Sequence, residues 1–326
     1  MKNYKYVFLF ALVMVAQFFA SCNEDSIDKT NDPIPYEPIG GYETSDAVAA
    51  DHLITKLSFD DNLTDSKSNI TGIVGTKVAY AAGIKGNAYS GSKTENRYAI
   101  GNGTAKITAL NSYTISFWLN SANTVPDGGS PGQGKGAQGI FSIVRPLDFW
   151  GGLNVFLQNP NSTFPDRLLL IFDLHNGRTG VAWKDQTVQI NIDNSLNKWI
   201  HIVFTYNPTS SVASAYVNGV FASNLTGFPY APPEGVVGSA TLYADNPGGL
   251  NNPNNAPKYG DYVMTGTNGK VVFGTHQFET IPPLNNGTNE PWATSLVGLL
   301  DEFRIYDSVL TNSEVSALYK LEKDNR

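Results

Sequence analysis

Apolar and polar residues alternate with a period of two in many short stretches of the chain, which is the pattern of half-buried β-strands. The stretch 113–120 places Trp118 on one side, and its other apolar residues share the opposite side: Tyr113, Ile115, Phe117 and Leu119. This strand is therefore predicted to be half buried or to face a second layer. Residues 52–59 also alternate, with one common face: Leu53, Thr55, Leu57 and Phe59. Further strands are predicted at 139–145, 152–158, 167–173, 187–192, 199–206, 213–218, 220–224, 270–274 and 297–306.

The predicted strand at 297–306 leads directly into a helix start. Its alternation places an acid in an apolar column: Leu299, Asp301, Phe303 and Ile305. Thr311 and Glu314 then have the spacing of a capping box, and Leu310 with Val315 can close a hydrophobic staple outside it. A short helix is expected over 312–320, and no other stretch has a helical pattern.

Turn and loop signals separate the strands. Asn218-Gly219 is the strongest hairpin signal, because a type I′ turn needs a positive φ at both central residues. Three segments lack the alternating strand pattern and are rich in Gly, Pro or Asn: 123–139, 238–262 and 276–294. Long irregular loops on a rigid scaffold often carry function, so binding residues are expected there.

Three motifs resemble the laminin-G-like domains of the concanavalin A-like lectin/glucanase superfamily. They are the Leu-Asp-Glu-Phe-Arg-Ile-Tyr strand at 300–306 with its helix, Trp199-Ile-His201, and Tyr216-Val-Asn-Gly219. The resemblance extends from about His52 to Tyr319. It implies an all-β, concanavalin A-like jelly-roll sandwich of two antiparallel sheets with one short C-terminal helix.

The N-terminus has the features of a lipoprotein signal. Lys2 and Lys5 precede an apolar run at 7–20, which is too short to span a bilayer comfortably. Cys22, the one cysteine of the chain, follows this run at the position of a lipidated cysteine in a bacterial lipobox. The alternative is an ordinary signal with an accidental cysteine. The predicted organisation is a signal peptide at 1–21, a lipidated Cys22 with a flexible tether at 22–48, and one domain at 49–326.

The residues after Cys22 and the overall charge suggest where the protein acts. The acidic stretch 23–28 resembles the surface-export signal of lipoproteins in the Bacteroidetes. We therefore expect a protein anchored by lipid in the outer membrane and facing the cell exterior. The net charge of −7 argues against a nucleic-acid partner, because phosphate recognition needs a basic surface.

Five aromatic residues lie in or beside the Gly- and Asn-rich loops: Trp150, Tyr243, Tyr259, Tyr262 and Trp292. A flat ring can stack on the C–H face of a sugar, and neighbouring amides and acids can pair with its hydroxyls. These residues are the carbohydrate-binding candidates, with Trp150 and Trp292 favoured. The alternative is that the rings close the ends of the sandwich or anchor their own loops.

The resemblance also implies a structural Ca²⁺ site. Related jelly-roll proteins can hold this ion with an aspartate near the C-terminus and oxygens close to the first strand, which here would be Asp301 and Asp60. Hard oxygen ligands suit Ca²⁺. The alternative is that Asp301 accepts backbone N–H groups or pairs with an arginine, as a buried carboxylate must.

No catalytic residues are predicted. The Glu-x-Asp-x-(x)-Glu strand of the superfamily's glycosidases is absent, since the single Glu-x-Asp pair is Glu322 with Asp324. Four histidines show no metal-binding spacing: His52, His175, His201 and His276. The sequence therefore favours a non-catalytic, surface-bound protein that captures a polysaccharide or oligosaccharide. An adhesion or protein-interaction module, and a hydrolase or lyase with an atypical site, remain open alternatives.

Overall fold

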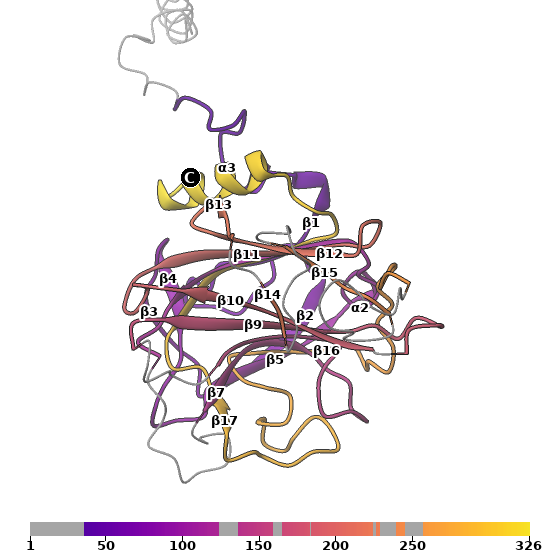
Figure 1. Ribbon diagram of the computed structural model, residues 1–326. Helices are drawn as coiled ribbons and strands as arrows, with labels where there is room; N and C mark the ends of the chain where they lie inside the picture. The colour runs from indigo at the N-terminus through magenta and orange to yellow at the C-terminus, as the bar shows by residue number, and fades with distance from the viewer. Residues whose placement is uncertain are drawn as a thin grey trace, which may run out of the picture. The chain divides into compact units, whose positions relative to one another are not determined.

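Two β-sheets pack face to face and enclose a continuous apolar core (Figure 1). The computed structural model describes residues 36–123, 136–158, 165–182, 184–223, 226–228, 239–244 and 257–326. The predicted signal peptide, Cys22 and most of the predicted tether lie outside these residues.

The first sheet has nine strands in its described part. Its order is β13 (Val220–Phe221), β12 (Val212–Val217), β11 (Ile200–Asn207), β6 (Tyr113–Asn120), β18 (Leu299–Tyr306), β4 (Asn87–Ser90) and β3 (Ala79–Ala82). In addition, β1 (Leu53–Leu57) pairs with β18, and β15 (Ser239–Thr241) pairs with β12.

The second sheet also has nine strands in its described part. Its order is β14 (Thr226–Phe228), β10 (Asp185–Ile192), β9 (Leu168–His175), β8 (Leu153–Leu157), β7 (Ala137–Ile143), β16 (Lys270–Phe273), β5 (Tyr98–Gly103) and β2 (Ile70–Thr76). Pairing in both sheets is antiparallel except for β17 (Ala293–Ser295), which runs parallel to β7. The architecture confirms the predicted jelly-roll sandwich.

Side chains from both sheets fill the core, as the period-two alternation of apolar and polar residues predicted. The predicted column of β6 is fully buried in it: Tyr113, Ile115, Phe117 and Leu119. Across the core, Phe172 of β9 stacks on Phe204 of β11 with ring centroids 4.2 Å apart. Aromatic stacking of this kind adds to the stabilisation from burial.

A C-terminal helix covers the outer face of the first sheet (Figure 1). This helix is α3 (Asn312–Lys323), and its capping box is formed by Thr311 and Glu314 as predicted. Leu310 and Val315 are both buried with Val203 of β11 in a second apolar cluster. Since α3 lies on the first sheet, the outer face of the second sheet lies on the opposite side of the sandwich.

Two β-bulges change the side-chain faces predicted for β18 and β1. In β18 the register with β6 shifts between Asp301 and Arg304, and Glu302 has a φ of 45°. As a result Leu300, instead of Leu299, joins Phe303 in the core. A similar shift in β1 turns Leu53 towards α3. Strict period-two counting fails at bulges because an extra residue reverses the side-chain faces.

Other elements went unpredicted. The strands β2, β3, β4 and β5 contain many Gly, Ala and polar residues, which weakens their hydrophobic signal. Three short helical segments were also missed: η3 (Ser45–Ala47), η4 (Ala50–His52) and α2 (Ala105–Thr108). None of the helices in the described part of the chain is both long and apolar enough to cross a bilayer.

The folded unit begins earlier than the predicted domain boundary at residue 49. Contacts place Pro38–Arg326 in one unit. Ile39 and Tyr42 pack against the cluster under α3, and Ser45 Oγ donates to the Arg326 carbonyl at 2.6 Å. Residues 38–48 were predicted as tether because they lack apolar periodicity, but contacts with the C-terminal helix hold them.

Candidate functional site

The outer face of the second sheet carries a row of polar and aromatic side chains. Along β8, β9 and β10, one set of alternating residues enters the core, including Val155, Phe172 and Val188. The other set faces outward: Asn154 and Phe156 of β8, Ile171 and Asp173 of β9, Thr187 and Gln189 of β10. The strand register places Phe156, Ile171 and Gln189 side by side, and likewise Asn154, Asp173 and Thr187.

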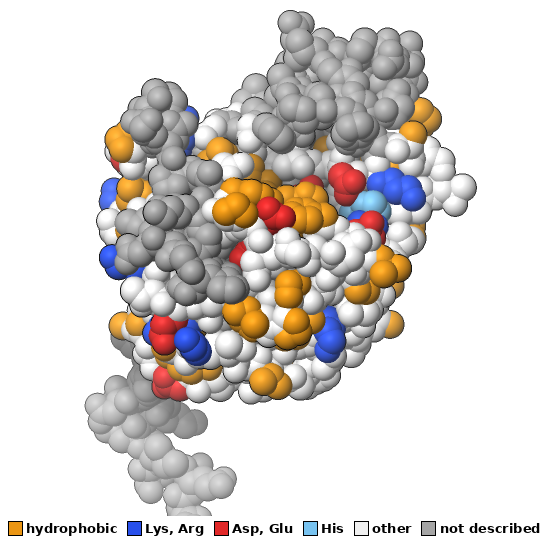
Figure 2. Space-filling model, turned by 90° about the horizontal axis from the view of Figure 1, so that it is seen from below, with side chains coloured by type: hydrophobic (Ala, Val, Ile, Leu, Met, Phe, Trp, Pro, Cys, Tyr) orange, Lys and Arg blue, Asp and Glu red, His pale blue; other side chains and the backbone are white. Residues whose placement is uncertain are grey.

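Two tryptophans from separate loops complete a groove on this face. The groove has a volume of about 250 Å³. It is lined by Ala137, Trp150, Phe156, Gln158, Ile171, Asp173, Thr187, Gln189 and Trp292. Figure 2 shows the molecule from the side of β7 and β17, where hydrophobic side chains gather next to acidic ones. The groove therefore combines apolar walls with a small number of polar groups, as small-molecule sites do.

The aromatic wall of the groove is held by other rings. Trp150 stacks on Phe156 with centroids 5.4 Å apart and an interplanar angle of 11°. Trp292 lies 6.1 Å from Trp150 and is 38% exposed, so part of its surface is open to a ligand. Behind them, Phe278 packs against both tryptophans. His276 is buried in the same cluster, and burial lowers its pKa to about 4, so it is neutral at pH 7.

Asp173 is the polar centre of the groove. It is 5% exposed, and its two carboxylate oxygens accept hydrogen bonds at 2.9 Å from Asn154 Nδ2 and Thr187 Oγ1. Burial, and then the negative charge of Asp185, raise the pKa of Asp173 to about 7. A carboxylate has about four acceptor positions, so Asp173 can accept further hydrogen bonds from a ligand.

Of the five predicted aromatic candidates, Trp150 and Trp292 come together in the groove. Tyr259 and Tyr262 belong to the core, so their assignment to an exposed site is wrong. The Tyr259 hydroxyl donates to backbone carbonyls of Leu174 and Lys184, and that of Tyr262 donates to Gly152. These tyrosines anchor their own loop through buried hydrogen bonds, which was the alternative considered.

Tyr243 also lies outside the groove. It is half-buried, and its carbonyl accepts from Gln186, whose side chain is on the core-facing side of β10. Seven of the nine groove residues were not predicted as site residues: Ala137, Phe156, Gln158, Ile171, Asp173, Thr187 and Gln189. All of them except Ala137 lie within predicted strands. For Thr187 and Gln189 the signal was the period-two alternation of 187–192.

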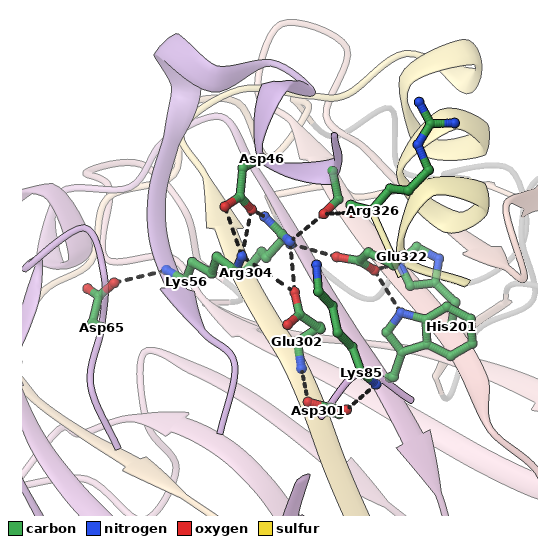
Figure 3. A network of polar contacts seen from close by, with 12 residues as sticks. Asp46, Lys56, Asp65, Lys85, His201, Asp301, Glu302, Arg304, Glu322 and Arg326 are labelled. Carbon is green, nitrogen blue, oxygen red and sulfur yellow. Dashed lines mark hydrogen bonds and ion pairs between the residues drawn. The ribbon is translucent and has the colours of Figure 1, made fainter. Parts of the chain in front are cut away.

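The two predicted calcium ligands, Asp301 and Asp60, accept backbone N–H groups around the turn between β3 and β4. Asp301 accepts from Ile84 at 2.9 Å and from Lys85 at 3.3 Å (Figure 3). Asp60 accepts from Asn87 at 2.8 Å. Burial raises the pKa of Asp301 to about 7. Within the described residues, no group of three or more His, Cys, Asp or Glu side chains could hold a metal ion. This geometry agrees with the alternative, in which Asp301 accepts backbone N–H groups.

A buried ion network lies under α3, on the side of the sandwich away from the groove (Figure 3). Arg304 is fully buried and donates to Glu322 at 2.6 Å, to Asp46 at 2.6 Å and to Glu302 at 2.8 Å. Burial alone would lower the pKa of Arg304, but Glu322 and the other anionic neighbours raise it well above its usual value. The network joins η3, β18 and α3, so its role is structural.

His201 and Trp118 are part of the same structural layer. His201 is buried beside Ser116 Oγ at 2.8 Å, and burial with the nearby Arg304 charge lowers its pKa to about 3. Trp118 Nε1 donates to Glu322 at 2.7 Å. Both residues therefore have structural roles.

Comparison with known proteins agrees with the fold. The family model described as the concanavalin A-like lectin/glucanases superfamily matches residues 92–255, half of the chain. The chain belongs to this superfamily. No curated protein matches the chain.

Solved structures similar to this superfamily member include binding domains of botulinum neurotoxins. The serotype D domain is 16% identical with a TM-score of 0.50, and the match covers 83% of this chain and 52% of the toxin chain. The serotype D/C VPI 5993 domain is 14% identical with a TM-score of 0.51 over the same shares. The chain thus spans about half the length of the toxin domains it matches, and these likenesses concern the fold.

A third similar structure is domain 4 of AbnA, an extracellular arabinanase of Geobacillus stearothermophilus, in complex with arabinotriose. It is 20% identical with a TM-score of 0.46, and the match covers 82% of this chain and 98% of that domain.

Proposed function

We propose that this superfamily member binds carbohydrate in the groove on the outer face of the second sheet, without cleaving it. The observation that carries the proposal is the meeting of Trp150 and Trp292 with Asp173 in one groove. Rings provide platforms for the C–H faces of a sugar, while Asp173, Thr187 and Gln189 offer partners for its hydroxyls.

The groove offers little support for hydrolysis. Glycosidases of the common mechanisms use two carboxyl groups that flank the scissile bond. Among the described residues that line the groove, Asp173 is the single acid. Asp185, the neighbouring acid, is engaged with His175 at 2.6 Å. These features favour binding over catalysis.

The protein-interaction alternative would need a broad exposed apolar surface. The large exposed apolar residues of the described chain instead come from separate elements, including Val74 of β2, Phe221 of β13 and Trp292 before β17. A groove with isolated rings and hydrogen-bonding groups suits a saccharide better.

A glycan array with the purified chain, followed by titration calorimetry on its best ligand, tests this function. Trp292→Ala is expected to weaken binding about tenfold, because one stacking ring contributes about 1.4 kcal/mol. Phe221→Ala is the matched control, since Phe221 is also 38% exposed but lies on the first sheet. Equal losses in both variants, or no glycan bound at all, would contradict the proposal.

We also propose that the chain is an outer-membrane lipoprotein, lipidated at Cys22 and facing the cell exterior. The support is the apolar run at 7–20 followed directly by Cys22 and the acidic stretch 23–28. Several acyl chains hold a protein stably on a bilayer. In a bacterial host, a clickable fatty-acid analogue should label the wild-type chain and fail to label Cys22→Ser. Labelling of the serine variant, or recovery of the wild type in the soluble fraction, would reject the anchor.

A further inference from the structure

We propose that Asp173 makes the groove selective for uncharged sugar rings and rejects rings that carry a carboxylate or sulfate. This inference rests on the proposed function, because it assumes that a saccharide occupies the groove. It assigns the substrate class as neutral glycans and Asp173 as the residue that determines this specificity.

The described lining of the groove carries no positively charged side chain. Recognition of carboxylates and sulfates uses arginine, lysine or several aligned N–H donors. None of the described residues that line the groove is Arg, Lys or His, and one is Asp173. An anionic ring placed there would meet a like charge and no cationic partner.

No positive group among the described residues forms an ion pair with Asp173. On the same face, Asp185 adds a second negative charge, and His175 is paired with it at 2.6 Å. Arg145 is the positive group with an influence on Asp173, but it faces Asp148 at 2.6 Å and donates to the Thr265 carbonyl at 3.0 Å. The whole chain carries a net charge of −7, which adds long-range repulsion of anionic polymers.

The Asp173 carboxylate is a hydrogen-bond acceptor with unused capacity. Each oxygen of Asp173 already accepts one hydrogen bond, from Asn154 or from Thr187, and retains acceptor capacity. Hydroxyl groups of a neutral sugar can donate to these positions, whereas an ionised sugar carboxylate has no proton to donate. Burial strengthens both the attraction and the repulsion, because the local dielectric constant is low.

The selectivity should depend on pH. Burial and the charge of Asp185 raise the pKa of Asp173 to about 7, so its negative charge increases as the pH rises through this value. Behind the sheet, burial raises the pKa of Tyr262, which therefore stays neutral at these pH values. Below about pH 6 the protonated acid can donate a hydrogen bond to a sugar carboxylate, and rejection should weaken.

The test is calorimetry with the full chain and two probe sets. One set contains neutral cello-, xylo-, manno-, galacto- and arabino-oligosaccharides, and the other contains oligogalacturonides and alginate oligosaccharides. At about pH 8, the best neutral probe is expected to bind at least about tenfold more tightly than the best acidic probe. This affinity difference should become severalfold smaller at about pH 5.5, where Asp173 is mostly protonated.

The variant Asp173→Asn should reduce the affinity difference between neutral and acidic probes at about pH 8 to about threefold or less. The variant Asp193→Asn should leave this affinity difference unchanged. Asp193 is the matched control because its carboxylate is 53% exposed and is paired with Arg167 outside the groove. The wild-type pH series provides the same test if the Asp173 variant does not fold. Comparable binding of an acidic probe that depends on Trp292, or a difference that does not change with pH, would overturn the selectivity alone. Binding of neither probe set would overturn the proposed function as well.

Discussion

Replacing Trp150 and Trp292 together by alanine is expected to reduce saccharide affinity at least about 100-fold. If each ring contributes about 1.4 kcal/mol of stacking, the loss of both corresponds to two factors of ten. Trp150 also stacks on Phe156, so a moderate fall in melting temperature should accompany the double substitution. Calorimetry measures the affinity, and circular dichroism confirms that the variant is folded.

A conservative substitution at Trp292 distinguishes loss of the stacking ring from loss of the folded structure. Trp292→Tyr keeps a flat ring at the partly exposed position and should retain affinity within about fivefold of the wild type. A folded double-alanine variant that binds its saccharide as tightly as the wild type would show that the ligand sits elsewhere.

Replacing Arg304 by alanine is expected to lower the free energy of unfolding by about 3–5 kcal/mol. Arg304 donates to Glu322, Asp46 and Glu302. Its removal leaves Glu322 buried without this ion-pair partner, and leaves buried Glu302 with Lys56 at 3.8 Å. Burial already raises the pKa of both glutamates, so both should take up protons more readily in the variant. Chemical denaturation of the wild type and the variant measures the difference.

The control for this prediction is Arg167→Ala. Arg167 pairs with Asp193 at 2.5 Å, and this ion pair lies at the surface, with the Asp193 side chain 53% exposed. Exposed pairs contribute about 0–1 kcal/mol, so the control should be close to the wild type. Losses of similar size in both variants would mean that the buried network does not hold α3 on the first sheet.

The sequence predicted the scaffold well because its strongest signals are local. The alternation in 113–120, the turn at Asn218-Gly219 and the capping box at Thr311 each depend on neighbouring residues, and the structure confirms all three. The hydrophobic signal was weak in β3 and β4, where one tyrosine stands among Ala, Asn and Ser. It was misleading at the bulge that includes Glu302, because the side-chain faces reverse there.

The groove was predictable only in part, because it depends on contacts between distant segments. Trp150 and Trp292 are 142 positions apart, and their convergence follows from the pairing of β17 with β7. Tyr259 and Tyr262 occur in a similar Gly- and Asn-rich context but are buried, which local composition does not reveal. In β9 both faces are buried or nearly so, and the apolar run around Asp173 did not show which face is outward.

A crystal structure of the chain with an oligosaccharide that it binds is the decisive test of carbohydrate binding in the groove. We expect a sugar ring in contact with Trp292, with a hydroxyl group within hydrogen-bond distance of Asp173 or Gln189. A saccharide bound on the α3 side of the sandwich, with the groove between Trp150 and Trp292 left without sugar, would contradict it.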